Sequence, residues 1–316
     1  RAYGGVVPEI AARRHLEVFP QVLRSAVEEG GVRWRDLDLI AVTTGPGLAS
    51  SLLVGVSTAK ALALRLEKPL CAVNHLEAHL ISLLLDPEVP EPEVLFPALI
   101  LLVTGGNTCL VHMQAVGRYR LMGQTLDDAA GEALDKGAAL LGLGYPGGPA
   151  LEKEADGGNG TEIRFPRGLE HPRGGEWIHG MDRSFCFSFS GVKTSLRYHL
   201  EKYPEDRALP RRRDTAASYQ AAVFDALLIR VKRALKRIPV KTLGVVGGVA
   251  RNRRLRTTLE EAARERGVAL CFAPPAYCTD NAAMIAGLAG LDPVTAAPVD
   301  VASLDIQPAL KLRAVT

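Results

Sequence analysis

The sequence predicts an α/β protein, because short apolar segments with strand character alternate along the chain with segments of helical periodicity. Asp38 to Thr44 alternates into an apolar run that stops at Gly45-Pro46-Gly47, as a strand does when it meets a turn. Ser50 to Leu66 then places small and apolar residues at helical spacing, and Leu70 to Val73 is a second short strand. Strand, helix and strand in this order are typical of α/β packing.

A second series of strands follows residues 86–97, a segment rich in proline and acidic residues that we interpret as a linker. The apolar run 98–103 predicts a buried strand, and 104–108 is predicted to form the Gly-rich tip of a β-hairpin. Further strands are predicted at 109–113, 118–122, 242–246 and 269–273, and helices at 129–143, at 218–237, up to 266 and from Asn281 onward. Residues 156–186 are rich in glycine and charge and show little periodicity.

The composition allows a large core and gives a weak charge signal. The chain has 316 residues, of which 47% are hydrophobic, and this is enough for two domains. A net charge of +3 does not by itself indicate a nucleic-acid partner. The arginines are clustered, however. Arg211-Arg212-Arg213, in a predicted loop, are the best candidates for phosphate contacts, whereas the run 230–237 is interpreted as a solvated helix face.

The cysteines and the apolar segments indicate in which cellular compartment the protein is expected. The five cysteines show no CxxC spacing and are expected to be buried thiols in a reducing compartment. No uninterrupted run of about 18 apolar residues and no signal peptide is found, so we expect a cytoplasmic protein with no membrane partner. The chain begins at Arg1 without a methionine, and a segment upstream is therefore expected.

Two histidines four residues apart are the main candidates for chemistry. Residues at this spacing lie about 40° apart around a helix axis, so His75 and His79 share one face and can bind one metal ion. A nearby carboxylate would complete a site that leaves coordination positions open. Glu77 is about 200° away from His75 around the axis and cannot serve as the general base of an HExxH protease. The alternative is a pair of ordinary helix-packing histidines.

Two Gly-Gly turns follow apolar strands, at Gly105-Gly106 and Gly247-Gly248. Glycine there would let the backbone approach a phosphate closely, and the second turn leads into a helix N-terminus that favours anions. Neither turn matches the Rossmann or P-loop pattern, and two tight turns without a ligand are the alternative.

Several polar residues lie close to these turns in the sequence. Asp127-Asp128 open the predicted long helix and are interpreted as its cap, whereas Asp135 lies deeper and is a candidate for a cleft. Asn252 follows the second turn and is a candidate for hydrogen bonding to a ribose or base. Ser190 is predicted to cap the helix after it, and Lys193 is a candidate cation near a phosphate.

Seven segments of the chain match one known family in order. The chain resembles the tRNA N6-adenosine threonylcarbamoyltransferases, once described as O-sialoglycoprotein endopeptidases, and resembles their bacterial branch. The matching segments are 3–15, 45–55, 73–80, 127–149, 187–196, 247–252 and 278–290. They span nearly the whole chain, so the resemblance is specific.

The resemblance implies a two-lobed actin/Hsp70/sugar-kinase-like fold (ASKHA, RNase H-like). It implies a first lobe in residues 1–93, an adenylate-binding second lobe in 94–275, and a C-terminal segment, 276–316, that returns to the first lobe. The family begins with a strand and a loop upstream of the segment that matches Tyr3. The first lobe is therefore expected to lack its first N-terminal strands.

The resemblance also implies the site residues. One divalent metal ion, iron or zinc, would be held by His75, His79 and Asp280. Threonylcarbamoyl-AMP would be bound by Leu102, Val103, Thr104, Gly105, Gly106, Asp135, Gly148, Glu152 and Asn252. The chain departs from the family at Asn107, where a histidine is usual. No catalytic residue is assigned.

The implied activity is transfer of the threonylcarbamoyl group from threonylcarbamoyl-AMP to N6 of adenosine 37 in tRNAs that read ANN codons, giving t6A and AMP. The expected partners are tRNA, a TsaB-like paralogue and a TsaE-like ATPase. The alternatives are an ATP-dependent kinase or ATPase of the same fold and a non-catalytic scaffold paralogue, neither of which needs the two histidines and Asp280 together. A metalloprotease is disfavoured because the HExxH glutamate is missing.

Overall fold

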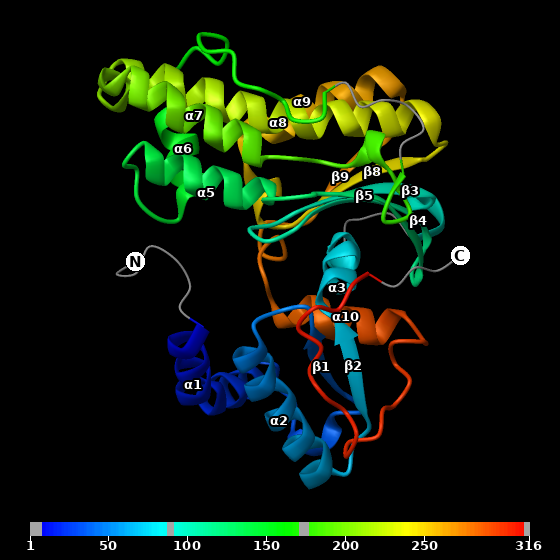
Figure 1. The fold of residues 1–316 in the computed structure, drawn as a ribbon. Helices are drawn as coiled ribbons and strands as arrows, with labels where there is room; N and C mark the ends of the chain where they lie inside the picture. The colour runs from blue at the N-terminus through cyan, green and yellow to red at the C-terminus, as the bar shows by residue number, and fades with distance from the viewer. Residues whose placement is uncertain (1–7, 87–91, 171–176, 313–316) are drawn as a thin grey trace. The chain divides into compact units, whose positions relative to one another are not determined.

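The computed structural model describes residues 8–86, 92–170 and 177–312. The chain forms two compact units: the first runs up to Ile81 and resumes at Asn281, and the second runs from Ser82 to Asp280 (Figure 1). Both units contain parallel strands joined through helices, so the predicted α/β class is confirmed. The lobe boundaries expected after 93 and 275 stay predictions.

The first unit is built on two parallel strands. Its elements are α1 (Pro8–Glu29), β1 (Ile40–Gly45), α2 (Ala49–Leu66), β2 (Leu70–Asn74), α3 (His75–Ile81) and α10 (Ala282–Leu291). Strand β1 pairs with β2 from Ile40 opposite Leu70 onward. Apolar residues of β1, α2 and β2 form the core, and the C-terminal residues Val299, Val301, Leu304 and Ile306 pack against it. The end of the chain therefore completes the core of the unit that the beginning of the chain starts.

Helix α2 is the one described helix that is long and apolar enough to cross a membrane by length and composition. Its mean hydropathy is 1.3, and the core helix of a soluble protein passes the same test. Val56, Ala59 and Ala63 of this helix are buried in the core of the first unit, and the helix also carries Lys60 and Arg65. These contacts account for its apolar residues on the buried face.

The second unit is built on a five-stranded mixed sheet in the order β5-β4-β3-β8-β9 (Figure 1). The strands are β3 (Ala98–Val103), β4 (Thr108–Ala115), β5 (Arg118–Gln124), β8 (Thr242–Val246) and β9 (Ala269–Phe272). The three strands β3, β4 and β5 form an antiparallel meander, and β3, β8 and β9 are parallel. All six residues of β3 are buried, as expected for a central strand with covered faces. The hairpin predicted around 104–108 is confirmed.

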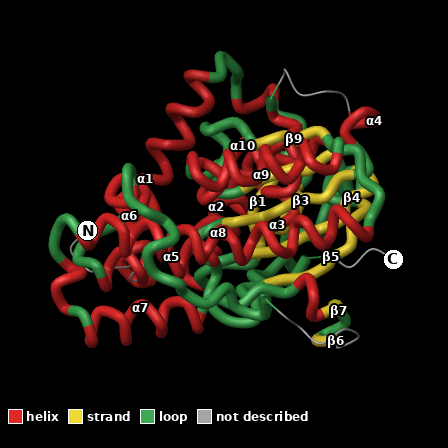
Figure 2. The backbone as a smooth tube through the Cα atoms, turned by 90° about the horizontal axis from the view of Figure 1, so that it is seen from above, coloured by secondary structure: helices red, strands yellow, loops and turns green. Residues whose placement is uncertain are grey.

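The helices of the second unit are α4 (Pro92–Leu95), α5 (Ala130–Leu140), α6 (Gly147–Ala155), α7 (Ser190–Lys202), α8 (Arg211–Arg237) and α9 (Arg253–Arg266). Figure 2 shows α8 and α9 running along one face of the sheet. The predicted linker contains the short helix α4 in its described part, and residues 87–91 of it lie outside the described residues. Within 156–186, the stretch with little periodicity, the short strands β6 (Trp177–Ile178) and β7 (Met181–Asp182) pair, and residues 183–185 form a 3-10 helix; residues 171–176 lie outside the described residues.

Two predictions about the arginine clusters are wrong. Arg211-Arg212-Arg213 form the first turn of α8 and not a loop, because α8 begins seven residues before the predicted start at 218. The run 230–237 is solvated only at its end, where Lys236 and Arg237 are exposed, whereas Arg230 is fully buried. Its guanidinium donates to the backbone carbonyls of Cys186, Arg167, Ala226 and Gly168, and burial lowers its pKa to about 10. Arg230 therefore attaches the backbone at Gly168 and at Cys186 to α8.

The prediction of buried thiols is confirmed for four of the five cysteines. Cys71, Cys109, Cys186 and Cys278 are buried and Cys271 is partly buried, and all five are free thiols. Burial raises the pKa of each, that of Cys109 to about 12, which leaves these thiols protonated and unreactive.

Candidate functional site

The two predicted Gly-Gly turns are neighbours in the second unit. Strands β3 and β8 are adjacent and parallel, with Leu102 opposite Val246, so both turns leave the same edge of the sheet. Gly247 has a φ of +95°, and a methyl group on its Cα would lie 2.3 Å from the carbonyl oxygen of Val103. Only glycine allows this close approach of the two backbones. The buried residues Leu102 and Val103 thus support the turn that follows them.

The turn after β3 is closed by hydrogen bonds to the side chain of its first residue, Thr104. Thr104 Oγ1 accepts hydrogen bonds from the N–H groups of Gly106 at 3.3 Å and Asn107 at 2.9 Å. Gly105 and Gly106 are exposed, have no positive φ, and would meet no atom within 4 Å if each carried a methyl group. Neither conformation nor packing explains glycine at these two positions. The two glycines leave the backbone of this turn bare and open to approach.

Asp135 connects helix α5 to the start of α6. Its Oδ1 accepts hydrogen bonds from the N–H groups of Gly147 at 2.9 Å and Gly148 at 3.1 Å. The carboxylate therefore caps α6 from another helix and lies at the positive end of the helix dipole. Gly147 packs against Asp135, whereas Gly148 has open space around it. The N-terminus of α5 is held close to the first turn, since a methyl on Gly131 would lie 2.5 Å from the oxygen of Thr104.

Glu152 and Asn252 meet at the start of α9. Glu152 Oε1 accepts a hydrogen bond from the N–H of Arg253 at 2.9 Å, and Asn252 Oδ1 accepts one from the N–H of Leu255 at 3.2 Å. Asn252 is thus the N-cap of α9 and is only 7% exposed. Its Nδ2 donates to Oε1 of Gln220 at 3.1 Å. Gln220 has no signal in the sequence, because nothing in the local pattern of a long helix distinguishes it from other polar residues.

The nine predicted ligand residues therefore lie along one connected path in the second unit. The path runs from the end of β3 through α5 and the start of α6 to the start of α9. The same path ends at a pocket of about 310 Å³ lined by Glu152, Ala155, Asp156, Gly157, Gly158, Gln220, Arg253, Arg254 and Thr257. Glycine turns, helix N-termini and a polar pocket are the groups that bind a phosphorylated nucleoside.

Asp127 and Asp128 do not cap the helix that follows them, contrary to the prediction. The N-cap position of α5 is Ala129. Asp127 Oδ1 accepts hydrogen bonds from the N–H groups of Phe189 at 2.7 Å and Ser190 at 3.2 Å, so it caps α7 instead. Burial raises the pKa of Asp127, but the hydrogen bonds from Ser188, Phe189 and Ser190 outweigh it and hold the pKa below the usual aspartate value.

Lys193 is paired with a carboxylate. Its Nζ lies 2.9 Å from Asp128 Oδ2, and Lys136 lies 3.1 Å from the other oxygen of the same carboxylate. Burial raises the pKa of Asp128, while the two lysines together lower it below its usual value. The sequence predicted Ser190 as the N-cap of α7. The N-cap residue is instead Phe189, and Ser190 is the first residue of the helix. Asp128 therefore joins α5 to α7 through its ion pairs with Lys136 and Lys193.

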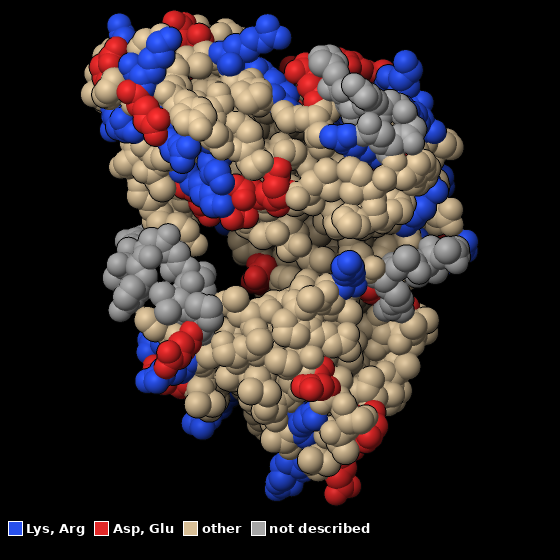
Figure 3. Space-filling model, viewed as in Figure 1, with Lys and Arg blue, Asp and Glu red and all other residues tan. Residues whose placement is uncertain are grey.

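Several of the clustered arginines are also paired. Arg211 lies 3.2 Å from Glu205, and Arg212 lies 2.9 Å from Glu154. On the face drawn in Figure 3, blue and red side chains lie beside one another over the second unit. Pairing of this kind reduces the attraction of single arginines for a nucleic-acid backbone.

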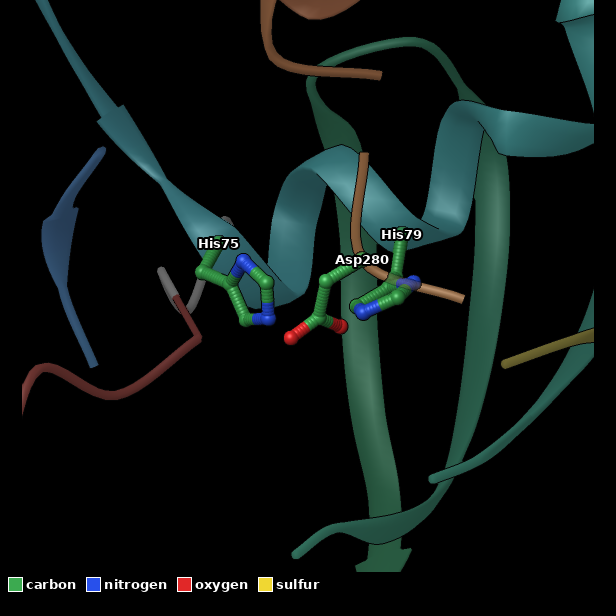
Figure 4. Close-up of side chains that lie close together, drawn as sticks. All are labelled: His75, His79 and Asp280. Carbon is green, nitrogen blue, oxygen red and sulfur yellow. The ribbon is translucent and has the colours of Figure 1, made fainter. Parts of the chain in front are cut away.

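The predicted metal ligands come together (Figure 4). Ligand atoms of His75, His79 and Asp280 all lie within 4.8 Å of one another. The two rings have centroids 4.8 Å apart at an angle of 77°, and the carboxylate of Asp280 points toward both. Asp280 directly precedes Asn281, whose side chain accepts the N–H of Met284 and so caps α10, and α10 packs against α3.

The donor set suits a divalent transition metal. Two imidazole nitrogens and one carboxylate oxygen are typical ligands of zinc and non-haem iron, and three protein ligands leave positions for water or substrate. His79 is 1% exposed and Asp280 is exposed, so one side of the group is protein and the other is accessible. The chain thus has a candidate metal site.

The model of one protein family matches residues 1–287, and its description reads tRNA N6-adenosine threonylcarbamoyltransferase. The chain belongs to the TsaD family. A protein of that name from Magnetococcus marinus is 50% identical over 287 residues, which are 90% of this chain and 77% of the relative. One from Trichlorobacter lovleyi is 47% identical over 284 residues, again 90% of this chain and 79% of the relative. The resemblance inferred from the seven segments is confirmed, and the chain is a transferase of this family.

Solved structures agree on the fold. HypF from T. kodakarensis superposes with a TM-score of 0.55 at 16% identity, over 85% of this chain and 42% of that one. Full-length HypF in a phosphate- and nucleotide-bound form gives 0.57 at 12% identity, over 86% of this chain and 48% of that one. At such low identity the likeness concerns the fold alone. It confirms the predicted ASKHA-type fold of this TsaD family member.

Proposed function

We propose that this protein transfers the threonylcarbamoyl group from threonylcarbamoyl-AMP to N6 of adenosine 37 in tRNAs that read ANN codons. The products are t6A and AMP. The observation that carries the proposal is the family membership together with three unobstructed glycines in the second unit, the exposed Gly105 and Gly106 and the partly exposed Gly148. These positions need glycine only if something approaches the backbone there.

The reaction is an acyl transfer. The lone pair of N6 attacks the carbamoyl carbon, the bond from that carbon to the phosphate oxygen breaks, and AMP leaves with the electron pair. The proton of N6 is lost to solvent or to the leaving phosphate. An exocyclic adenine amine is a weak nucleophile, so the protein has to supply orientation and stabilise the negative charge that develops on the carbonyl and phosphate oxygens.

Each of the nine residues has a proposed task in binding the adenylate. The turn after β3, from Leu102 to Gly106, offers an exposed backbone to the phosphate. Asp135 orients the start of α6 so that Gly148 faces the ligand without a side chain. Glu152 and Asn252 hold the start of α9 beside the nucleoside. Together these residues would hold the donor in one orientation and leave its carbamoyl carbon open to attack by N6.

The proposed metal site lies in His75, His79 and Asp280. A divalent iron or zinc ion bound there would supply a Lewis acid for an oxygen of the threonylcarbamoyl group. The chain's own contribution is to hold two imidazoles on one face of α3 and to leave one side of the group accessible. The proposed partners are tRNA, a TsaB-like paralogue and a TsaE-like ATPase.

The test is tRNA modification. The protein is incubated with the partner proteins, ATP, threonine, bicarbonate, an adenylate-forming enzyme and unmodified tRNA that reads ANN codons, and the digested nucleosides are analysed by mass spectrometry. We expect t6A with the wild type and with His179→Asn, an exposed histidine outside the seven matching segments, and none with His79→Ala. No t6A from the wild type, beside a working positive control, would reject the proposal and favour the kinase and scaffold alternatives.

A further inference from the structure

Helix α8 carries a buried glutamine whose amide lines a pocket. Gln220 is only 2% exposed, yet it lines the pocket of about 310 Å³ together with Glu152, Arg253 and Arg254. Most polar residues of a helix that covers a sheet face solvent, because burying a carboxamide costs free energy unless it is hydrogen-bonded. A glutamine with so little exposed surface at a pocket wall directs its polar atoms either to protein partners or into the pocket.

The orientation of the Gln220 amide is fixed by Asn252. The carbonyl oxygen of the Asn252 side chain accepts the N–H of Leu255, so its nitrogen is the end that points to Gln220. That nitrogen donates to Oε1 of Gln220 at 3.1 Å. Gln220 is therefore the acceptor in this bond, and its Nε2, with two N–H groups, is directed elsewhere.

The amide nitrogen of Gln220 has no hydrogen-bond partner among residues 8–86, 92–170 and 177–312. This nitrogen is not one of the fully buried unpaired polar atoms of the described residues, so water can reach it and a ligand acceptor can take the place of that water. The pocket is the open space next to this side chain. The unpaired donor is thus placed where a ligand acceptor can reach it.

The pocket offers a donor and an acceptor together. Gln220 supplies an N–H donor, and Glu152 supplies a carboxylate whose Oε1 is held by the N–H of Arg253 at 2.9 Å. Adenine presents the complement of this pair, because its N6 amine donates and the neighbouring ring nitrogen accepts. Guanine presents an acceptor oxygen where adenine has the amine, so the same pair would oppose it.

We propose that Gln220 donates a hydrogen bond to a ring nitrogen of the adenine base of the adenylate and so selects adenine over guanine. Asn252 acts as the positioning residue that fixes the direction of the Gln220 amide. This inference rests on the proposed function, because it assigns the nucleoside of that substrate to this pocket.

Binding of AMP and GMP, measured by isothermal titration calorimetry, tests the proposal. We expect the wild type to prefer AMP. Gln220→Glu keeps the acceptor for Asn252 and removes the donor, so it should weaken AMP binding about five-fold or more and abolish the preference over GMP. Gln220→Leu should do the same. Gln114→Leu, at an exposed glutamine of β4, is the matched control and should bind as the wild type does.

A second measurement does not depend on any variant folding. The wild type is titrated with 1-deaza-, 3-deaza- and 7-deaza-AMP, each of which lacks one ring acceptor. We expect one of the three to bind about five-fold more weakly than AMP, and that analogue should show no further loss with Gln220→Glu. Equal binding of all three analogues to the wild type would overturn the proposal, as would unchanged AMP binding by a folded Gln220→Glu variant.

The t6A assay separates this inference from the proposed function. If the wild type forms t6A while Gln220→Glu keeps the wild-type KM for threonylcarbamoyl-AMP, the role of Gln220 is refuted and the function stands. If the wild type forms no t6A but shows the deaza-AMP pattern and its loss in Gln220→Glu, the adenine contact is supported and the transferase proposal is the one that fails.

Discussion

Asp127 caps the helix that begins at Ser190, 63 residues further along the chain. Its Oδ1 accepts the backbone N–H of Ser190 at 3.2 Å, and its Oδ2 accepts the hydroxyl of the same residue at 2.8 Å. The start of an α-helix has unpaired N–H groups that a side chain must satisfy. Here the side chain comes from the segment that leads into α5, so the two helices α5 and α7 are joined at their starts.

Replacing Asp127 should destabilise the second unit. Asp127→Asn loses the charge and one acceptor, and we expect the free energy of unfolding to fall by about 1–2 kcal/mol, the usual cost of a lost helix cap. Urea denaturation followed by circular dichroism measures the change. Glu260→Gln, an exposed residue of α9, is the control and should leave stability unchanged. Equal midpoints for the two variants would show that the cap contributes nothing.

The contribution of Asp127 should depend on pH with a definite sign. Its pKa is lowered in the folded protein, so the ionised form is the stabilising one. The stabilisation is fully present above the unfolded pKa of about 3.9 and is lost as the pH falls through the lower folded value. The difference in stability between wild type and Asp127→Asn should be constant from about pH 8 to pH 5 and shrink below about pH 4. A difference that grows on acidification would contradict the assignment.

Two adjacent glycines should respond differently to alanine. A methyl on Gly147 would lie 2.5 Å from Cα of Asp135, whereas one on Gly148 would meet nothing within 4 Å. We expect Gly147→Ala to lower the free energy of unfolding by about 2 kcal/mol through overpacking. Gly148→Ala should leave stability within about 0.5 kcal/mol, because alanine is the better helix former.

Gly148→Ala, which should leave stability nearly unchanged, should be the variant that impairs function. If the bare backbone of Gly148 is needed for the ligand, Gly148→Ala should raise the KM for threonylcarbamoyl-AMP in a protein of normal stability. Thermal unfolding and the t6A assay on the same preparation measure both quantities. A stable Gly148→Ala variant with an unchanged KM would remove Gly148 from the proposed ligand contacts.

Metal content should depend on both histidines and on Asp280. We expect the purified wild type to carry one divalent ion per chain by inductively coupled plasma mass spectrometry, and His79→Ala and Asp280→Ala to lose it, because two remaining ligands bind such ions weakly. His179→Asn, at an exposed histidine outside the matching segments, should retain the metal. Full metal content in His79→Ala would show that the ion is bound elsewhere.

Local patterns predicted much of the fold. The strand positions and the helical face shared by His75 and His79 follow from periods of two and 3.6 residues, which any segment carries in its own sequence. The start of α8 was missed because the charged residues Arg211 to Arg213 lack an apolar stripe. The predictions of caps at Asp127 and Ser190 are wrong because Asp127 caps a helix that is distant in the sequence, which local patterns do not indicate.

The sequence by itself determined the α/β class, the family and the helix face that presents His75 and His79. The resemblance to the family also implied that Asp280 joins those histidines, and the structure brings the three together. Only the tertiary structure decided that Arg230 is buried against backbone carbonyls and that Asn252 orients Gln220. The physical reason is that periodicity and propensity act over a few residues. Contacts between distant segments depend on the packing of whole elements, which selects one partner from many residues of the same type.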